Sequence, residues 1–136
     1  MTGQRRASVR PQPMIAVTDV EKASLWYQHV LGATSGHGGP EYEQLLVDGE
    51  LIMQLHHLEV GHHHGTIADP AQPRGNGVAI WFEVDDFDAA VHRIRQAAAR
   101  IVTDVHLNPN AGHHEIWLRD LDGYLVVLTE AHRNPF

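Results

Sequence analysis

Ile15-Ala16-Val17-Thr18-Asp19-Val20 opens a pattern that returns later in the chain as Phe82-Glu83-Val84-Asp85-Asp86-Phe87. In both copies an apolar, β-branched run ends at Val, an Asp follows, and a helical period begins, over 21–31 in the first copy and 88–98 in the second. Each copy then continues as two apolar runs separated by an Asp-Gly step, over 45–55 and 116–128, and such a step favours a tight hairpin. This internal repeat predicts two tandem modules, each a strand, a helix and a hairpin.

The helix ends are marked by short polar and glycine signals. Asp19 is the expected N-cap of the first helix, which we expect to end at Gly32. Asp85 or Asp86 is the expected N-cap of the second helix, whose apolar positions recur at helical spacing from Phe87 to Ala97 and Ala98. Residues 33–42 and 58–77 are rich in Gly, Pro and His, so we predict a loop and an inter-module linker there.

Several phrases resemble the vicinal oxygen chelate superfamily, which includes glyoxalase I, extradiol dioxygenases, fosfomycin-modifying enzymes and bleomycin-resistance proteins. They are Ala16-Val17-Thr18-Asp19-Val20-Glu21-Lys22, Trp26-Tyr27, Leu31-Gly32, Phe82-Glu83-Val84-Asp85-Asp86 and Arg119-Asp120-Leu121-Asp122-Gly123-Tyr124. The resemblance covers residues 12–130 and implies a fold more than an activity, because the superfamily hosts unrelated chemistries on one scaffold.

The fold implied by this resemblance is α+β, with two tandem βαβββ modules forming a cup-shaped mixed sheet and helices on its convex side. The expected organisation is one domain over 1–136, with a first module over 12–57, a linker over 58–77 and a second module over 78–130. Residues 1–10 are expected to be a flexible tail. Ala99 stands where the family usually has a Gly that ends the second helix.

Composition excludes some partners. The formal net charge is −7 and the only Lys is Lys22, which argues against nucleic acid, because phosphate binding needs a clustered basic surface. The chain has no Cys, and no apolar run approaches the length that spans a bilayer. We therefore expect a cytoplasmic protein with no membrane partner.

The four metal-ligand positions of the family correspond to Gln12, Gln54, Ala79 and Val127 in this chain. Ala79 and Val127 have no donor atom, and two neutral amides cannot replace imidazole and carboxylate, so we expect no metal and no cofactor at the standard position. An alternative metal position is the histidine cluster formed by His56-His57 and His62-His63-His64.

Strand alternation from the same positions predicts which side chains line the cup. The expected ligand-binding residues are Gln12, Met14, Ile52, Gln54, His56, Trp81, Trp117 and Arg119, and the candidates for acid/base catalysis are Glu83, His113 and Glu115. Mostly apolar walls with a few polar groups are typical of a small-molecule site. Structural alternatives stay open: Glu83 can pair with Arg119, His56 and His113 can be hydrogen-bonded structural residues, and the two Trp residues can form dimer contacts.

Two functions from different classes follow. The first is a metal-free binding protein, similar to the bleomycin-resistance branch, that holds an apolar or aromatic molecule. The second is an enzyme: a divergent lyase, isomerase or dioxygenase with a displaced metal, or a metal-free acid/base catalyst that uses Glu83, His113 or Glu115. We favour the binding protein, and we expect a homodimer, because tandem modules leave sheet edges that a second copy can cover.

Overall fold

The computed structural model describes residues 8–58 and 67–131. The first module consists of β1 (Met14–Val17), α1 (Val20–Leu31), β2 (Thr34–His37), β3 (Tyr42–Val47) and β4 (Glu50–His57). Its four strands form one sheet in the order β1-β4-β3-β2, in which β1 runs parallel to β4 and the other pairs are antiparallel.

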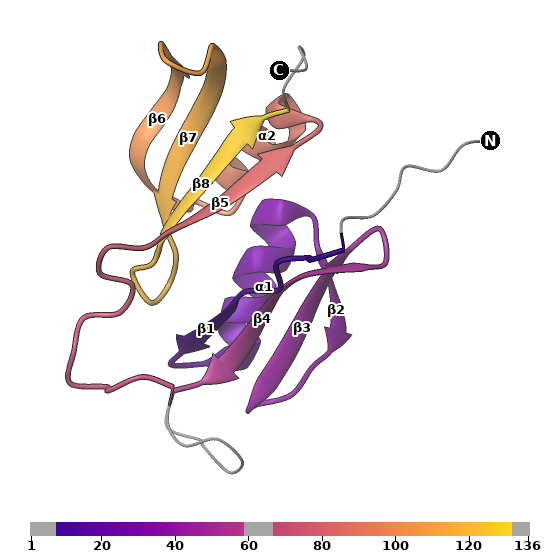
Figure 1. Cartoon of the computed structure of the whole chain (residues 1–136), viewed down its shortest axis with the longest axis vertical. Helices are drawn as coiled ribbons and strands as arrows, with labels where there is room; N and C mark the ends of the chain where they lie inside the picture. The colour runs from indigo at the N-terminus through magenta and orange to yellow at the C-terminus, as the bar shows by residue number, and fades with distance from the viewer. Residues whose placement is uncertain (1–7, 59–66, 132–136) are drawn as a thin grey trace.

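The second module repeats this arrangement with β5 (Ala79–Val84), α2 (Phe87–Gln96), β6 (Arg100–Asn108), β7 (His113–Arg119) and β8 (Leu125–Glu130). Its sheet has the order β5-β8-β7-β6, with β5 parallel to β8 and antiparallel pairs elsewhere. The predicted α+β fold of two tandem βαβββ modules is confirmed. The strands form two four-stranded sheets, one in each module (Figure 1).

The helices begin and end close to where the sequence places them. Asp19 accepts a hydrogen bond from the Lys22 amide (3.0 Å), and α1 ends at Gly32, whose φ of 69° is left-handed. Asp86 accepts from the Ala89 amide (3.0 Å) at the start of α2. The second helix has no Gly at its end, and Ala98 there adopts a φ of 51°, which is unfavourable for a residue with a Cβ atom.

The prediction of a loop over 33–42 is wrong in part, because Thr34–His37 forms β2. Gly36 makes this pairing sterically feasible: a Cβ atom there would lie 2.8 Å from the Leu46 side chain of β3. Pairing with β3 therefore overrides the weak strand propensity of this glycine-containing segment.

The two Asp-Gly steps form different turns. Asp48 and Gly49 both have positive φ (51° and 78°), as a two-residue hairpin between β3 and β4 requires. Asp122-Gly123 instead belongs to a longer connection over 120–124, in which the Asp120 carboxylate accepts hydrogen bonds from the amides of Asp122 and Tyr124, both at 2.9 Å. The prediction of a tight hairpin holds for the first module only.

Both helices lie on the same side of the two sheets, behind them in Figure 1. The core fills the space between each helix and its sheet, with fully buried Tyr27, Leu45, Met53, Leu55, Ile94, Ile116, Leu118 and Leu128. The opposite face of each sheet carries no helix. Among the described residues, neither helix has the length and apolar character needed to cross a membrane.

The modules are joined by a set of contacts between the start of the first module and the β7–β8 connection, which we call the module joint. Tyr27 of α1 donates to the Asp120 carboxylate (2.5 Å), and the Tyr124 hydroxyl donates to the Ala16 carbonyl (2.8 Å). The Thr18 amide and hydroxyl both donate to Asp122, at 2.9 and 2.7 Å. This joint fixes how the second sheet sits on the first module.

Candidate ligand-binding site

The helix-free face of the second sheet presents its side chains in three rows, because directly paired residues on neighbouring strands point to the same side. The first row is Ala79, Leu125, Arg119 and Arg100; the second is Trp81, Val127 and Trp117; the third is Glu83, Thr129, Glu115 and His106. Ile116 and Leu118, which alternate with the β7 members of these rows, lie in the core. The alternation inferred from the sequence therefore places Trp117 and Arg119 on the open face.

The middle row is aromatic. Trp81 and Trp117 meet edge to face, with ring centroids 6.0 Å apart and planes inclined by 84°. Val127 lies between them in strand order and is completely buried, whereas Trp81 is 47% exposed. Aromatic pairs prefer this geometry, and the pair leaves an apolar surface open to solvent that could stack against a planar molecule.

Glu115 is the centre of the polar third row. Its carboxylate is almost completely buried and accepts hydrogen bonds from the Asn108 amide and the Trp117 indole, both at 3.0 Å. The His106 Nε2 lies 3.5 Å away and the His113 Nδ1 lies 4.0 Å away. Burial acts to raise the Glu115 pKa, but these hydrogen bonds and imidazoles outweigh it, so the pKa lies below its ordinary value. Glu115 is thus a poor proton acceptor near neutral pH and a good anchor for the Trp117 ring.

His113 is also buried, and its Nδ1 lies 2.6 Å from the Thr129 hydroxyl. That hydroxyl lies 3.3 Å from the carbonyl of His114, to which it can donate. These contacts fit the structural alternative for His113, in which the imidazole is a hydrogen-bonded part of the sheet.

Glu83 and Arg119 lie in different rows, so the structure does not pair them. Glu83 stands beside Thr129 in the third row, whereas Arg119 stands beside Leu125 in the first row. The Arg119 guanidinium donates to the Gly123 carbonyl (3.0 Å). The two charges therefore lie at different parts of the open face.

A groove of about 820 Å³ runs along the first row. One wall is the connection over 70–79, and the other contains Trp117, Arg119 and Leu125 together with the Asp122-Gly123 turn. A second cavity of about 420 Å³ lies between the modules and includes Ile52 and Glu83. Of the predicted site residues, Trp117 and Arg119 line the groove, Ile52 and Glu83 line the second cavity, and the others belong to neither lining.

The predicted residues of the first module form a separate polar patch. The Gln54 side chain accepts a hydrogen bond from the Tyr42 hydroxyl (2.5 Å) and donates to the backbone carbonyl of Gln12 (2.9 Å). His56 Nδ1 contacts the His57 carbonyl (2.8 Å), and the His56 ring lies near Tyr42. Met14 and Gln54 are register partners on this face.

The structure shows the surroundings of the four positions that the resemblance assigns to metal ligands. Gln54 is engaged by Tyr42, Gln12 is contacted through its backbone, and Ala79 and Val127 carry hydrocarbon side chains. Within the described residues, no three His, Cys, Asp or Glu side chains converge as a metal site would require. Of the histidine cluster, His62-His63-His64 lie outside the described residues.

Four residues that contribute to these faces were not among the predicted site residues. Tyr42 orients Gln54, His106 approaches Glu115, Arg100 extends the first row, and Arg74 lines the groove. Strand alternation applied to 100–108 would have found Arg100, but His106 follows two irregularities in the register of β6, which alternation alone does not reveal.

Comparisons with known proteins place the fold. The family model of the Glyoxalase/Bleomycin resistance protein/Dioxygenase superfamily matches residues 10–128. Among curated proteins, none matches the chain.

Solved structures of similar fold include a protein of unknown function from Agrobacterium tumefaciens str. C58, with a TM-score of 0.71, 20% identity, and coverage of 97% of this chain and 98% of that one. TioX from Micromonospora sp. ML1 has a TM-score of 0.69 at 21% identity, with coverage of 90% and 98%. A lactoylglutathione lyase from Agrobacterium tumefaciens has a TM-score of 0.67 at 18% identity, with coverage of 93% and 96%. Identities this low support a shared fold.

Proposed function

Because the chain belongs to the Glyoxalase/Bleomycin resistance protein/Dioxygenase superfamily, we propose that it is a small-molecule-binding protein that holds an apolar or aromatic ligand without a metal. The observation that carries this proposal is the Trp81–Trp117 pair, with Trp81 47% exposed on the helix-free face of the second sheet. A large exposed aromatic surface beside a groove is typical of a ligand site. We further propose that the protein is cytoplasmic and forms a homodimer.

Hydrogen bonding supports a rigid aromatic wall. Glu115 fixes the Trp117 ring through its indole nitrogen, and Asn108 holds the second oxygen of that carboxylate. A ring fixed in this way loses little conformational entropy when a ligand stacks against it. The geometry therefore favours binding of a planar molecule over a purely structural role for the tryptophan pair.

A thermal-shift screen of aromatic metabolites and antibiotics, followed by tryptophan fluorescence, tests the proposal. A Trp26→Phe background removes the signal of the third tryptophan, which lies in α1 against the core. A bound ligand should quench the remaining fluorescence, and Trp81→Ala should weaken affinity by about 1–3 kcal/mol, as expected for loss of a stacked aromatic anchor. The proposal would be excluded if the screen gave no hits and no added compound changed the tryptophan fluorescence.

The same screen addresses the enzymatic alternative. Glu83 lines the cavity between the modules and is exposed, whereas Glu115 is almost completely buried, so Glu83 is the more accessible candidate for a general base. Chemically unchanged recovery of a hit after long incubation supports sequestration. Turnover that is lost in Glu83→Gln but kept in Trp81→Ala would instead establish catalysis.

Metal content is a further test. Untagged protein treated with a mild chelator should contain no stoichiometric Zn, Ni, Mn or Fe, because the standard position lacks suitable donors. One tightly held metal per chain would contradict the proposal. If that metal disappeared when His62, His63 and His64 were replaced by Ala, the histidine cluster would be its binding site.

A further inference from the structure

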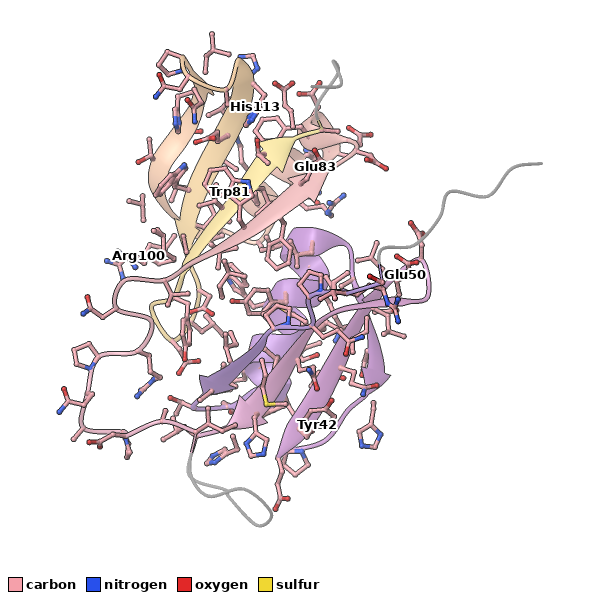
Figure 2. The ribbon with its side chains drawn as sticks, in the orientation of Figure 1. Tyr42, Glu50, Trp81, Glu83, Arg100 and His113 are labelled. Carbon is pink, nitrogen blue, oxygen red and sulfur yellow. The ribbon has the colours of Figure 1, made fainter. Side chains whose placement is uncertain are left out.

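The charges on the open face of the second sheet are separated along the strands. Arg100 and Arg119 are paired directly in the first row, the tryptophans occupy the middle row, and Glu83 and Glu115 occupy the third row. Figure 2 shows this order: Arg100 at the start of β6, Trp81 in the middle of the sheet, and Glu83 and His113 towards the other end. The two ends of this face therefore differ in charge: the first row carries two guanidinium groups, whereas the third row carries the exposed Glu83 and the buried Glu115.

The pairing of Arg100 with Arg119 is unusual in physical terms. Like charges directly opposite each other on antiparallel strands destabilise the pair. Within residues 8–58 and 67–131, neither guanidinium forms a salt bridge with a carboxylate, although the chain carries a formal net charge of −7. Arg119 uses one nitrogen for the Gly123 carbonyl, which leaves further N–H groups for another acceptor.

The groove itself holds two guanidinium groups, Arg119 on one wall and Arg74 on the opposite wall, and Arg100 adjoins Arg119 outside the groove lining. Arg74 lines the groove and contacts the Thr18 hydroxyl (3.4 Å). The acidic residue of the groove lining is Asp122, whose Oδ1 accepts from the Thr18 amide and hydroxyl and lies 3.5 Å from Arg74 Nε. Asp122 is thus engaged by Thr18 and Arg74, and within the described residues it forms no salt bridge with Arg119.

The spacing between the rows matches a small aromatic acid. Trp117 and Arg119 are two residues apart on one strand, which separates their Cα atoms by about 7 Å. A ring that stacks on Trp117 thus brings a substituent on its edge to the Arg119 guanidinium. The third row would repel the same group if the molecule bound in the reverse direction.

We propose that this groove selects aromatic molecules that bear one oxyanion group, a carboxylate in the simplest case. The ring packs against Trp117 in the groove and extends towards Trp81 beside it. The oxyanion accepts hydrogen bonds from Arg119, and Arg100 adjoins Arg119 just outside the groove lining. Guanidinium binds carboxylate in a planar, two-point geometry, which gives orientation as well as affinity. This inference rests on the proposed function and adds the charge and the direction of the ligand.

Matched pairs of an aromatic acid and its amide distinguish recognition of the oxyanion from recognition of the aromatic ring. We would titrate 2-naphthoate against 2-naphthamide, and indole-3-acetate against indole-3-acetamide, by calorimetry with the full chain. The acid of each pair should bind at least about tenfold more tightly than the amide, and added NaCl should reduce this ratio. Trp117→Ala should weaken both members of a pair.

Variants of the arginine residues test which guanidinium group binds the oxyanion of the ligand. Arg119→Gln should weaken the acid far more than the amide and so bring the acid-to-amide affinity ratio to within about threefold, and Arg100→Gln should lower the ratio by a smaller factor. Arg95→Gln is the matched control, because Arg95 is an equally charged side chain that pairs with Asp104 (2.9 Å) at an exposed position of α2. If Arg119→Gln fails to fold, the Arg100→Gln variant provides the test. Arg100 is exposed, and within the described residues its side chain forms no hydrogen bond or salt bridge.

Each remaining outcome is decisive. Equal affinity of acid and amide for the unmodified protein would overturn this inference and leave the proposed function intact. A ratio that survives in the Arg100→Gln/Arg119→Gln double variant, or that falls equally in Arg95→Gln, would also overturn it. If neither member of any pair binds, both the inference and the proposed function fail.

Discussion

Two buried carboxylates, Glu115 and Asp120, respond to their surroundings in opposite ways. Hydrogen bonds and imidazoles hold the Glu115 pKa below its ordinary value, despite burial. Burial raises the Asp120 pKa, and the hydrogen bonds from Tyr27, Tyr124 and Asp122 only partly offset it. The two residues should therefore couple folding to pH with opposite signs.

Glu115→Gln should lower the free energy of unfolding by about 1–2 kcal/mol at neutral pH, because one carboxylate oxygen becomes a donor that faces another donor. The folded pKa of Glu115 is lowered, so its stabilising contribution is present above the ordinary carboxyl pKa and is lost as pH falls through the lowered value. The difference between variant and unmodified protein should shrink on acidification. Urea unfolding at about pH 7 and about pH 3.5 measures it.

Asp120→Asn is the matched control. The folded pKa of Asp120 is raised, so its contribution is present below the ordinary carboxyl pKa and is lost as pH rises through the folded value. The destabilisation caused by this substitution should accordingly grow on acidification. If the two variants changed with pH in the same direction, the assignment of opposite shifts would be wrong.

At the residue scale, the sequence indicated which face of a strand a side chain occupies better than it indicated which residues that side chain contacts. Strand alternation assigned Glu115, Trp117 and Arg119 to one face of β7, and in the structure the alternating residues Ile116 and Leu118 lie in the core, because the period of a strand is fixed. Glu115 was proposed as a catalyst, yet its contacts with Asn108 and His106 depend on the irregular register of β6. Alternation carries no information on such irregularities.

At the scale of elements, the end of α2 offers a stabilising substitution. Ala98 adopts a φ of 51°, and an L-residue with a Cβ atom pays about 1–2 kcal/mol there relative to glycine. Ala98→Gly should raise the free energy of unfolding by about 0.5–1 kcal/mol, after the entropy of glycine in the unfolded chain is subtracted. Ala97→Gly, at a right-handed φ of −73°, should lower it instead. Equal effects in thermal unfolding would contradict this explanation.

The linker contains a second matched pair. Gly75 and Gly77 both have positive φ (69° and 81°), but a Cβ atom at Gly75 would lie 2.5 Å from the Tyr124 ring, whereas one at Gly77 would meet nothing within 4 Å. Tyr124 is buried and bonded to Ala16, so it cannot easily move. Gly75→Ala should therefore destabilise the protein by about 1–3 kcal/mol more than Gly77→Ala. Denaturation midpoints that agree between the two variants would show that the linker can shift away from Tyr124.

The helices and most strands were predictable, because caps and periodicity are local signals. Asp19, Gly32 and Asp86 marked the helix ends that the structure has. β2 was missed because its formation depends on the neighbouring strand β3, and the second Asp-Gly step was misjudged because Asp120 organises a longer turn. Both errors concern contacts made after the chain has folded back on itself.

At the scale of the whole molecule, the exposed apolar surface predicts self-association. Residues Val102, Val105 and Leu107 of β6 are 40–55% exposed, and β6 is the outer strand of its sheet. Open edges with apolar side chains pair readily with a second copy. We therefore expect a homodimer at tens of micromolar by light scattering.

Charge substitutions test where the copies meet. Leu107→Glu should shift the equilibrium towards monomer at least about tenfold, because a carboxylate would be buried without a partner at the edge. Leu25→Glu is the control, since Leu25 is 66% exposed on α1, away from that edge. A monomer for the unmodified protein, or a dimer that tolerates Leu107→Glu, would contradict an interface at β6.

The module joint has a consequence for how copies of this chain can combine. It is made by side-chain tips and a turn, through Tyr27 with Asp120, Thr18 with Asp122 and Tyr124 with Ala16, and it includes no shared strand. Such contacts can form equally well between the two modules of one polypeptide and between modules of two different polypeptides. The connecting segment adds the contacts of Arg74 with Thr18 and Asp122, and it raises the effective concentration of one half near the other. We therefore expect that at high protein concentration the first half of one copy can dock on the second half of its neighbour.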